Sequence, residues 1–313
     1  MVPEDRLVVV SIDTEVDKGP DWKISNPVRF SGSSKAITQV LLPLFERYGV
    51  KPTFLLSSEV IEHEPSAQTF RALAGIAELG THLHAQFVEP QRILFPDSMA
   101  GADANAIQNQ YPPEVEQQKL QTLTQMFRDT FQRAPTAFRS GRYAMSARTL
   151  EFLAGLGYRV DSSVTPGIRW LYKEGLVDFS QWSAMPRRVA TNAGPIVELP
   201  ITIHPRSRLA RRIGAFPRRL RTLAERALLG WGSFQWLRPS WSSGAELVAL
   251  AQRSQERILV MTFHNIELVP GASPYAQSVA AVNRIVSAMD EFFDFCQRAK
   301  YRFCTMTEAA ETV

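Results

Sequence analysis

Short apolar runs rich in β-branched and aromatic residues alternate with longer amphipathic runs along most of the chain. This alternation constrains the fold most strongly, because it is typical of βα units whose parallel strands are covered by helices. The short runs predict strands at 7–13, 51–56, 81–84, 136–139, 158–161, 196–199, 258–264 and 301–304. The longer runs predict helices at 35–48, 69–79, 114–133, 146–156, 243–256 and 273–299. Gly49 and Gly80 stand where two helices are expected to end, and Ser146 where one begins.

Two segments interrupt this alternation. The first, at about 85–113, is rich in Gln, Asn, Asp and Pro, and the second, at about 204–240, is rich in Arg. The chain has 313 residues, 45% of them hydrophobic, which is enough for one large core, and no linker-like stretch divides it. We therefore predict a single α/β domain over 1–313, a distorted (β/α)7-type barrel related to the TIM barrel, with two long insertions. Periodicity alone does not exclude a doubly wound sheet.

The apolar segments and the cysteines bear on the compartment. No uncharged apolar run approaches the roughly 20 residues that a membrane-spanning helix needs. The apolar stretch from Leu7 to Ile12 is too short for the core of a signal peptide, so we expect a cytoplasmic protein. Cys296 and Cys304 have no metal-ligand spacing and are expected to be buried free thiols.

Polar residues gather where five predicted strands end. They are Asp13 and Glu15, His82 and His84, Arg139 and Tyr143, Asp161, and His264. Active-site residues of parallel α/β barrels lie at this end of the strands. Side chains two apart on a strand point the same way, so Asp13 should face with Glu15, and His82 with His84.

Two imidazoles and a carboxylate are a common ligand set for hydrolytic zinc. Taken singly, the acids could be helix caps and His264 a core histidine; agreement among five strand ends favours a site. His63 and His204 lack such neighbours and are interpreted as structural.

The motifs at these strand ends resemble those of the NodB-homology polysaccharide deacetylases, carbohydrate esterase family four. The matching segments, in the same order, are 11–15, 80–84, 138–143, 161–167 and 263–275. The last, FHNIELVPGASPY, is similar to a bacterial branch linked to lipopolysaccharide and surface-polysaccharide synthesis. The resemblance implies a distorted barrel and the metal-dependent removal of an N-acetyl or other N-acyl group from a sugar in a glycan or lipid-linked glycan precursor.

The resemblance also implies a role for each residue. Asp13 resembles the catalytic base and Arg139 its ionic partner, whereas Glu15, His82 and His84 resemble ligands of a divalent metal, expected to be Zn²⁺. His264 resembles the general acid, Asp161 the acid that tunes it, and the backbone N–H of Tyr143 a donor to the oxyanion. The chain departs from the family pattern in three places. Thr14 separates the two acids, Gln86 stands in the place of the second histidine, and Gly141-Arg142 replaces a proline before Tyr143.

Nine arginines lie between His204 and Arg238 against one acid, Glu225. They are either a solvated face or, with Trp231, Phe234, Trp236, Leu237 and Trp241, a patch for peripheral contact with anionic lipid at the inner membrane. No nucleic-acid-binding motif accompanies the charge, and no Gly-rich phosphate loop follows the first strand. Alternative functions are an N-deformylase or other amide hydrolase on the same site, and an inactive carbohydrate-binding barrel.

Overall fold

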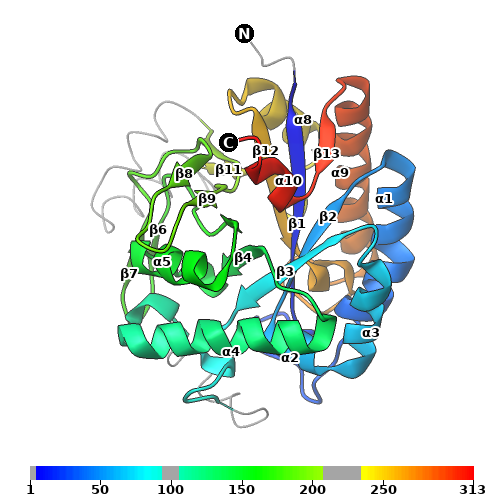
Figure 1. Cartoon of the computed structure of the whole chain (residues 1–313). Helices are drawn as coiled ribbons and strands as arrows, with labels where there is room; N and C mark the ends of the chain where they lie inside the picture. Colours follow the sequence, from blue (N-terminus) through cyan, green and yellow to red (C-terminus); the bar gives the residue numbers. More distant parts are fainter. Residues whose placement is uncertain (1–4, 94–105, 207–233) are drawn as a thin grey trace.

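The computed structural model describes residues 5–93, 106–206 and 234–313, and these form a strongly curled parallel sheet surrounded by helices (Figure 1). The parallel strands, in their order across the sheet, are β12 (Ile258–His264), β1 (Leu7–Thr14), β2 (Pro52–Leu56), β3 (Glu78–Leu83), β4 (Ala137–Ser140), β5 (Val160–Asp161) and β9 (Ile196–Glu198). Strand β8 (Arg187–Val189) adds antiparallel to β9, and β13 (Arg302–Cys304) pairs with the first half of β1.

Hydrogen bonds link β12 to the chain that follows β9. The Thr202 backbone N–H donates to Val260 O over 3.1 Å, and the Val260 N–H donates to the Thr202 hydroxyl over 2.8 Å. The Thr262 N–H donates to Leu237 O over 3.2 Å. The sheet is thereby drawn into a distorted barrel, which confirms the predicted fold class.

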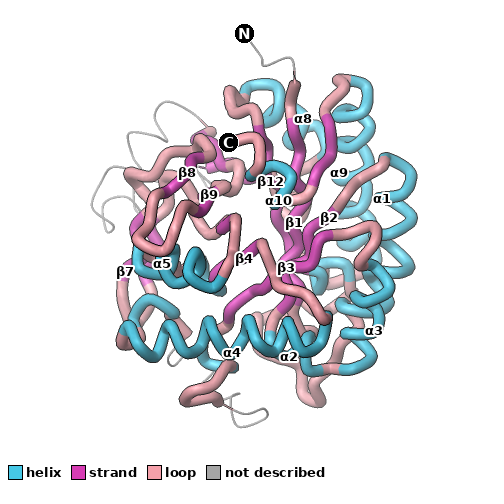
Figure 2. Tube along the Cα trace, in the orientation of Figure 1, coloured by secondary structure: helices cyan, strands magenta, loops and turns pink. Residues whose placement is uncertain are grey.

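All helices except α10 (Met306–Ala310), which packs against inward-facing residues at the amino ends of the strands, cover the outer surface of the sheet (Figure 2). They are the π-helix η1 (Gly32–Leu41), α1 (Leu42–Tyr48), α2 (Ser58–Glu62), α3 (Glu64–Leu73), α4 (Pro113–Phe131), α5 (Ala147–Leu156), α8 (Gly244–Arg253) and α9 (Val279–Arg298). Short 3₁₀ turns lie at η2 (Ala85–Phe87), η4 (Gln108–Gln110), η5 (Gly141–Tyr143) and η7 (Asn265–Leu268). Two small hairpins pair β6 (Arg169–Leu171) with β7 (Leu176–Asp178) and β10 (Ile203–Pro205) with β11 (Phe234–Trp236).

Of the three residues predicted to mark a helix start or end, two do so in the structure. Gly49 ends α1 in the left-handed conformation at φ 63°, and Ser146 begins α5 with a capping box. The prediction for Gly80 was wrong, because it lies inside β3 rather than at a helix end. A Cβ there would lie 2.4 Å from the carbonyl oxygen of Ala137, so glycine allows β3 and β4 to approach. Helix α9 begins at Val279, after the Ser278 cap, instead of at 273.

Alternate residues of the strands face the inside of the barrel. We call the half of the barrel at the amino ends of the strands the lower half, although it lies toward the top of Figure 1. Its inward residues are apolar and buried: Leu7, Val9, Leu55, Ala137, Val160, Val197, Ile258 and Val260. Met306 and Ala309 of α10 pack against them. This cluster fills the lower half, so a site inside the barrel has to lie toward the carboxyl ends of the strands.

Among the described residues, no helix is long and apolar enough to cross a membrane. Both cysteines are free and buried, as predicted, and burial raises the pKa of each thiol. The central parts of the two predicted insertions, 94–105 and 207–233, lie outside the described residues.

Candidate active site

The inward-facing positions become polar in the upper half of the barrel. On β1 the inward series Leu7, Val9 continues as Ser11 and Asp13, and the parallel register places them beside Thr262 and His264 of β12. The register also pairs His82 of β3 with Arg139 of β4. The period of two that buries the apolar core therefore also directs the polar side chains to one interior layer.

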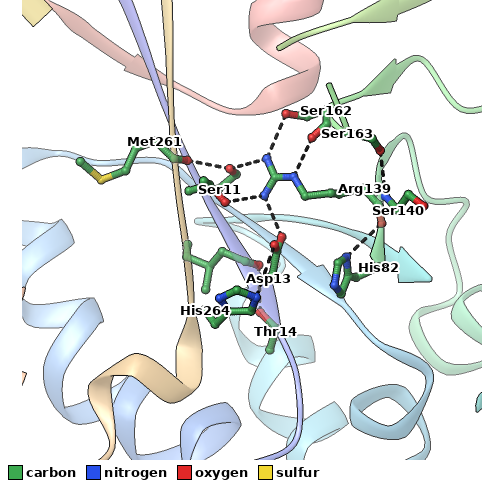
Figure 3. A network of polar contacts seen from close by, with 12 residues as sticks. Ser11, Asp13, Thr14, His82, Arg139, Ser140, Ser162, Ser163, Met261 and His264 are labelled. Atoms are coloured by element: carbon green, nitrogen blue, oxygen red, sulfur yellow. Dashed lines mark hydrogen bonds and ion pairs between the residues drawn. The ribbon is translucent and has the colours of Figure 1, made fainter. Parts of the chain in front are cut away.

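Arg139 lies at the centre of this layer and is completely buried (Figure 3). Its Nε–H donates to Ser162 O over 2.7 Å, and Nη1 donates to Asp13 Oδ1 over 2.7 Å and to the Thr262 hydroxyl over 3.0 Å. Nη2 donates to the hydroxyls of Ser11 at 2.8 Å and Ser162 at 2.9 Å. All five N–H groups thus have acceptors, which fixes the guanidinium rigidly beside Asp13. The predicted contact between Arg139 and Asp13 is confirmed.

The surroundings of Asp13 keep it ionised. Burial raises the pKa of this carboxyl, but the adjacent Arg139 guanidinium, together with His82 and His264, lowers the pKa below its ordinary value. The second oxygen, Oδ2, lies 3.9 Å from Nε2 of His264. The ionised carboxylate and the imidazole nitrogen are therefore close enough for one water molecule to form a hydrogen bond with each.

Glu15, His82 and His84 converge at the top of this layer, as predicted. Glu15 Oε1 lies 3.1 Å from His82 Nε2 and 2.8 Å from His84 Nε2, and one ligand atom from each residue lies within 4.8 Å of the others. Two imidazole nitrogens and one carboxylate oxygen, with open positions beside them, form a donor set suited to a catalytic divalent metal.

The tautomer of His82 provides a test of that fit. Its Nδ1–H donates to the carbonyl oxygen of Arg139 over 3.0 Å, so the neutral ring presents a lone pair at Nε2. That lone pair would face an oxygen of a carboxylate 3.1 Å away, and two acceptors this close are stabilised by a proton or a metal ion shared between them. A metal ion or a proton satisfies the pair, so the residues fit the metal.

Lys18 is an unpredicted neighbour of this cluster. Its ammonium contacts Glu15 Oε2, while Oε1 faces the two imidazoles. Burial raises the pKa of Glu15, but Lys18 and then His84 lower it well below its ordinary value. Lys18 therefore leaves Oε1 as the oxygen directed to the imidazoles.

His264 is held by the ion pair between Glu267 and Arg238. Its Nδ1 lies 2.8 Å from Oε1 of Glu267, three residues later on turn η7, and the guanidinium of Arg238 contacts the same oxygen. Burial raises the pKa of Glu267, whereas Arg238 and His264 lower it below its ordinary value. His264 Nε2 is thereby directed toward Asp13 and Glu15, at 3.9 and 3.8 Å.

The position of Asp161 corrects the expectation that it tunes His264. Val160 points into the barrel, so its neighbour Asp161 points to the other face of β5. There it accepts from the Ser163 N–H at 3.0 Å and hydroxyl at 2.7 Å, and lies beside Glu198 of β9. Burial raises the pKa of both carboxyls, and Asp161 raises that of Glu198 well above its ordinary value. The carboxylate beside His264 is Glu267.

Tyr143 borders the cavity on an unusual backbone. Both Arg142 and Tyr143 have positive φ angles, 54° and 55°, which are costly for residues with a Cβ. Gly141 precedes them because a Cβ there would lie 2.5 Å from Leu83 O and 3.1 Å from His84 Nδ1. The turn is therefore packed directly against His84, one of the three candidate metal ligands.

The polar layer forms the floor of a cavity of about 750 Å³. Its walls carry aromatic side chains: Trp22, Phe87, Tyr143, Trp170, Tyr172, Trp241 and Tyr275. Tyr143 stacks on Trp170 with ring centroids 5.4 Å apart, and Trp22 packs edge-on against Tyr275 at 5.5 Å. Such a mixture of aromatic walls and a few polar groups is typical of small-molecule sites.

Within the described residues, the predicted patch of arginines and aromatic side chains is only partly exposed: Trp241 is 38% exposed and Phe234 half-buried. Trp236, Leu237 and Arg238 are buried, at 6%, 0% and 3% exposure, and Arg238 belongs to the cavity wall. Arg206 pairs with Glu246. The other arginines of that segment and Trp231 lie outside the described residues.

The two histidines interpreted as structural lie outside the cavity lining. His63 stacks on Phe30 with ring centroids 3.7 Å apart, and its Nδ1 bonds the Ser66 hydroxyl. His204 pairs with Glu256 at 3.0 Å. Each imidazole thus has a local partner within the scaffold.

No protein-family model and no curated protein matches the sequence. A solved structure assigned as a polysaccharide deacetylase from Mycobacterium smegmatis matches with a TM-score of 0.56 and 17% identity, over 100% of this chain and 92% of that one. Another so assigned, from Pseudomonas aeruginosa PAO1, matches with a TM-score of 0.54 and 12% identity, over 98% and 91%.

The chain has the polysaccharide deacetylase fold. An allantoinase also matches, with a TM-score of 0.54 and 11% identity, over 98% of this chain and 90% of that one. At such identities the likeness establishes the polysaccharide deacetylase fold, and one fold carries more than one chemistry. The residues of the cavity therefore determine which reaction is possible.

Several residues of the site were not singled out from the sequence. Ser11, Ser162 and Thr262 share the inward parity of the strands, so that pattern could have identified them. Lys18 and Arg238 lie on loops, where no periodic signal exists. Glu267 lies in the 263–275 motif, but only the η7 turn brings it back to His264.

Proposed function

We propose that the protein is a metal-dependent hydrolase that removes an N-acetyl or other N-acyl group from a sugar of a glycan or lipid-linked glycan precursor. The observation that supports this best is the composition of the cavity floor. An ionised Asp13 locked to Arg139, the Glu15–His82–His84 cluster and His264 all face one space. Together they supply a base, a metal site and an acid within a few ångströms.

Glu15, His82 and His84 would hold the ion, which we propose to be Zn²⁺ because imidazole and carboxylate ligands with open positions suit it. When bound, Zn²⁺ supplies Lewis-acid polarisation of the carbonyl and lowers the pKa of water toward ~7. The described residues contribute the remaining chemistry.

Asp13 removes a proton from the attacking water as the water oxygen adds to the carbonyl carbon. Arg139 keeps Asp13 ionised for that step and fixes its orientation. The Tyr143 N–H donates to the developing oxyanion. His264, protonated at both nitrogens, then delivers its Nε2 proton to the sugar nitrogen as the C–N bond breaks, releasing a carboxylic acid and the free amine; the proton held by Asp13 returns to His264.

The cavity walls suit a saccharide. Aromatic faces at Trp22, Trp170 and Tyr172 offer flat apolar surfaces, and charged side chains at Lys173 and Glu174 lie on the rim. A volume of about 750 Å³ is within the range of ordinary ligand cavities. The 263–275 motif supports a surface-polysaccharide precursor as the substrate class.

One observation favours a second candidate, a carbohydrate-binding barrel without activity. The ammonium of Lys18 already neutralises Glu15, the only carboxylate of the predicted ligand set. A cation on this carboxylate opposes a divalent ion through charge repulsion. The binder and the enzyme are distinguished by whether amide bonds are broken.

The test is product formation from a panel of N-acetyl, N-formyl and O-acetyl sugars, free and lipid-linked, incubated with Zn²⁺-reconstituted protein. Our proposal expects release of acetate with appearance of a primary amine. Formate release alone would assign the deformylase alternative. Saccharide binding without release of either acid would contradict the hydrolase and leave the binding barrel.

A further inference from the structure

We propose that Glu267 and Arg238 form a positioning pair that holds His264 in one tautomer, with the Nε2 atom directed into the cavity. The part of this inference that concerns turnover rests on the proposed function. The part that concerns the tautomer rests on geometry alone.

The position of Glu267 follows from the local chain. His264 is the last residue of β12, and the 3₁₀ turn η7 begins immediately after it. The turn brings Glu267 back so that Oε1 lies 2.8 Å from Nδ1 of His264. A carboxylate only accepts, so His264 donates its Nδ1–H, and Nε2 is left as the nitrogen that exchanges protons in the cavity.

Arg238 stabilises the buried negative charge of Glu267. Glu267 is completely buried, and an isolated carboxylate in that position would be strongly disfavoured. The Arg238 guanidinium, 3% exposed, contacts the same Oε1 and lies 3.0 Å from Nδ1 of His264. Nδ1 could accept from Arg238 only in the opposite tautomer; we assign the proton to Nδ1 because its closer contact, at 2.8 Å, is with the carboxylate, which cannot donate. Arg238 therefore neutralises Glu267 without replacing its hydrogen bond to the imidazole.

The guanidinium is itself fixed by the cavity wall. It stacks over the ring of Trp241 at 4.3 Å and of Tyr275 at 5.2 Å, and its Nε–H donates to the Ser240 hydroxyl over 3.0 Å. Trp22 in turn lies 5.1 Å from the His264 ring. The aromatic wall and the imidazole are thus oriented through one side chain, which enters from the segment after β11.

The other buried acid near the strand ends does not compete for this role. Asp161 faces away from the barrel interior and shares its environment with Ser163 and Glu198. Asp13 and Glu15 approach His264 only from the Nε2 side, at 3.9 and 3.8 Å. Among the described residues, the carboxylate within hydrogen-bond distance of Nδ1 is that of Glu267.

The experiment compares Glu267→Gln with Asp161→Asn, two isosteric replacements of a carboxylate by an amide. Two-bond ¹H–¹⁵N correlation spectra of metal-free protein labelled in its histidines, recorded at about pH 8.5, two units above the ordinary pKa of a free imidazole, report each tautomer. His264→Asn assigns the signal. We expect Nδ1–H in the wild type and in Asp161→Asn, and a mixture with Nε2–H in Glu267→Gln, because an amide can also donate to Nδ1.

Kinetics form the second readout. With the substrate of the proposed reaction, Glu267→Gln should lower kcat about 10²–10⁴-fold, the usual contribution of a general acid, while KM changes little. Arg238→Lys, which keeps the charge but loses the planar fork, should retain more activity than Arg238→Met. If Glu267→Gln unfolds because Arg238 is left unpaired, the double variant Arg238→Met/Glu267→Gln buries no lone charge and serves in its place.

Each outcome decides one of the two proposals. An unchanged His264 tautomer in folded Glu267→Gln, or in the double variant, overturns the positioning pair, as does a change in Asp161→Asn alone. A shifted tautomer in a protein that hydrolyses nothing supports the positioning pair and refutes the proposed function. A shifted tautomer with full kcat refutes the catalytic consequence of the pair.

Discussion

The two halves of the barrel interior are built by the same strands with the same inward parity, yet they differ completely in chemistry. In the lower half, Leu7 and Val9 of β1 pack with Ile258 and Val260 of β12. In the upper half, Ser11 and Asp13 of β1 lie beside Thr262 and His264. The comparison teaches that one periodic pattern serves two purposes here. Burial of the lower residues stabilises the frame, and that frame holds charged groups in fixed positions above it.

The largest expected effect concerns the upper half. Asp13→Asn should lower kcat about 10²–10⁴-fold, because the amide cannot take up the proton from water. Metal content should stay unchanged, since Asp13 is not among the predicted ligands. Initial rates of amine release measure the effect, with Asp21→Asn on the exposed cavity rim as the matched control. Normal turnover in Asp13→Asn would show that another group is the base.

The lower half should respond in stability instead. Leu7→Ala removes a completely buried side chain at the amino end of β1, and such changes cost about 2–5 kcal/mol. We expect the midpoint of urea unfolding to fall while kcat of the folded protein stays within about twofold of the wild type. Ile76→Ala, at a position 60% exposed, is the control and should change stability by less than ~0.5 kcal/mol. A loss of kcat in Leu7→Ala as large as that in Asp13→Asn would break the division between the two halves.

A smaller, pH-dependent effect on stability is expected from Glu198, on the outward face of the upper strands. The pKa of Glu198 is raised well above its ordinary value by burial and by Asp161. The folded state then binds more protons than the unfolded state between these pKa values, so stability falls as pH rises through that window, by about 1.4 kcal/mol per unit of pKa shift. Glu198→Gln should remove this dependence.

Urea unfolding at pH 5 and pH 8 measures it. The free energy of unfolding of Glu198→Gln minus that of the wild type should be larger at pH 8 than at pH 5. Identical pH profiles for the two proteins would mean that Glu198 titrates normally and that the Asp161–Glu198 pair is not strained by burial.

Much of this arrangement was accessible from the sequence because its strands are periodic. Short continuous apolar runs identified β1 and β12, and rules for parallel barrels placed Asp13, Glu15, His82, His84 and His264 together at one end. The structure brings these five side chains around one cavity. The parity of two also predicts that His82 and His84 face the same way, as they do.

The errors arose where periodicity carries no information. Strand β5 has two residues, too few to reveal that Val160 rather than Asp161 points inward. Gly80 was read as a helix end because a glycine needed for close packing of two strands looks the same in sequence. Arg238 and Lys18 act through tertiary contacts of loops, which only the folded chain defines.

The most direct test of the central claim is the metal content of the purified protein, measured by elemental analysis beside His82→Ala/His84→Ala and the matched control His63→Ala/His204→Ala. The account predicts about one Zn²⁺ or similar divalent ion per chain in the wild type and the control, and none in the site variant. Absence of metal from all three proteins after reconstitution, or equal metal in the site variant, would contradict a catalytic metal centre in the upper half of the barrel.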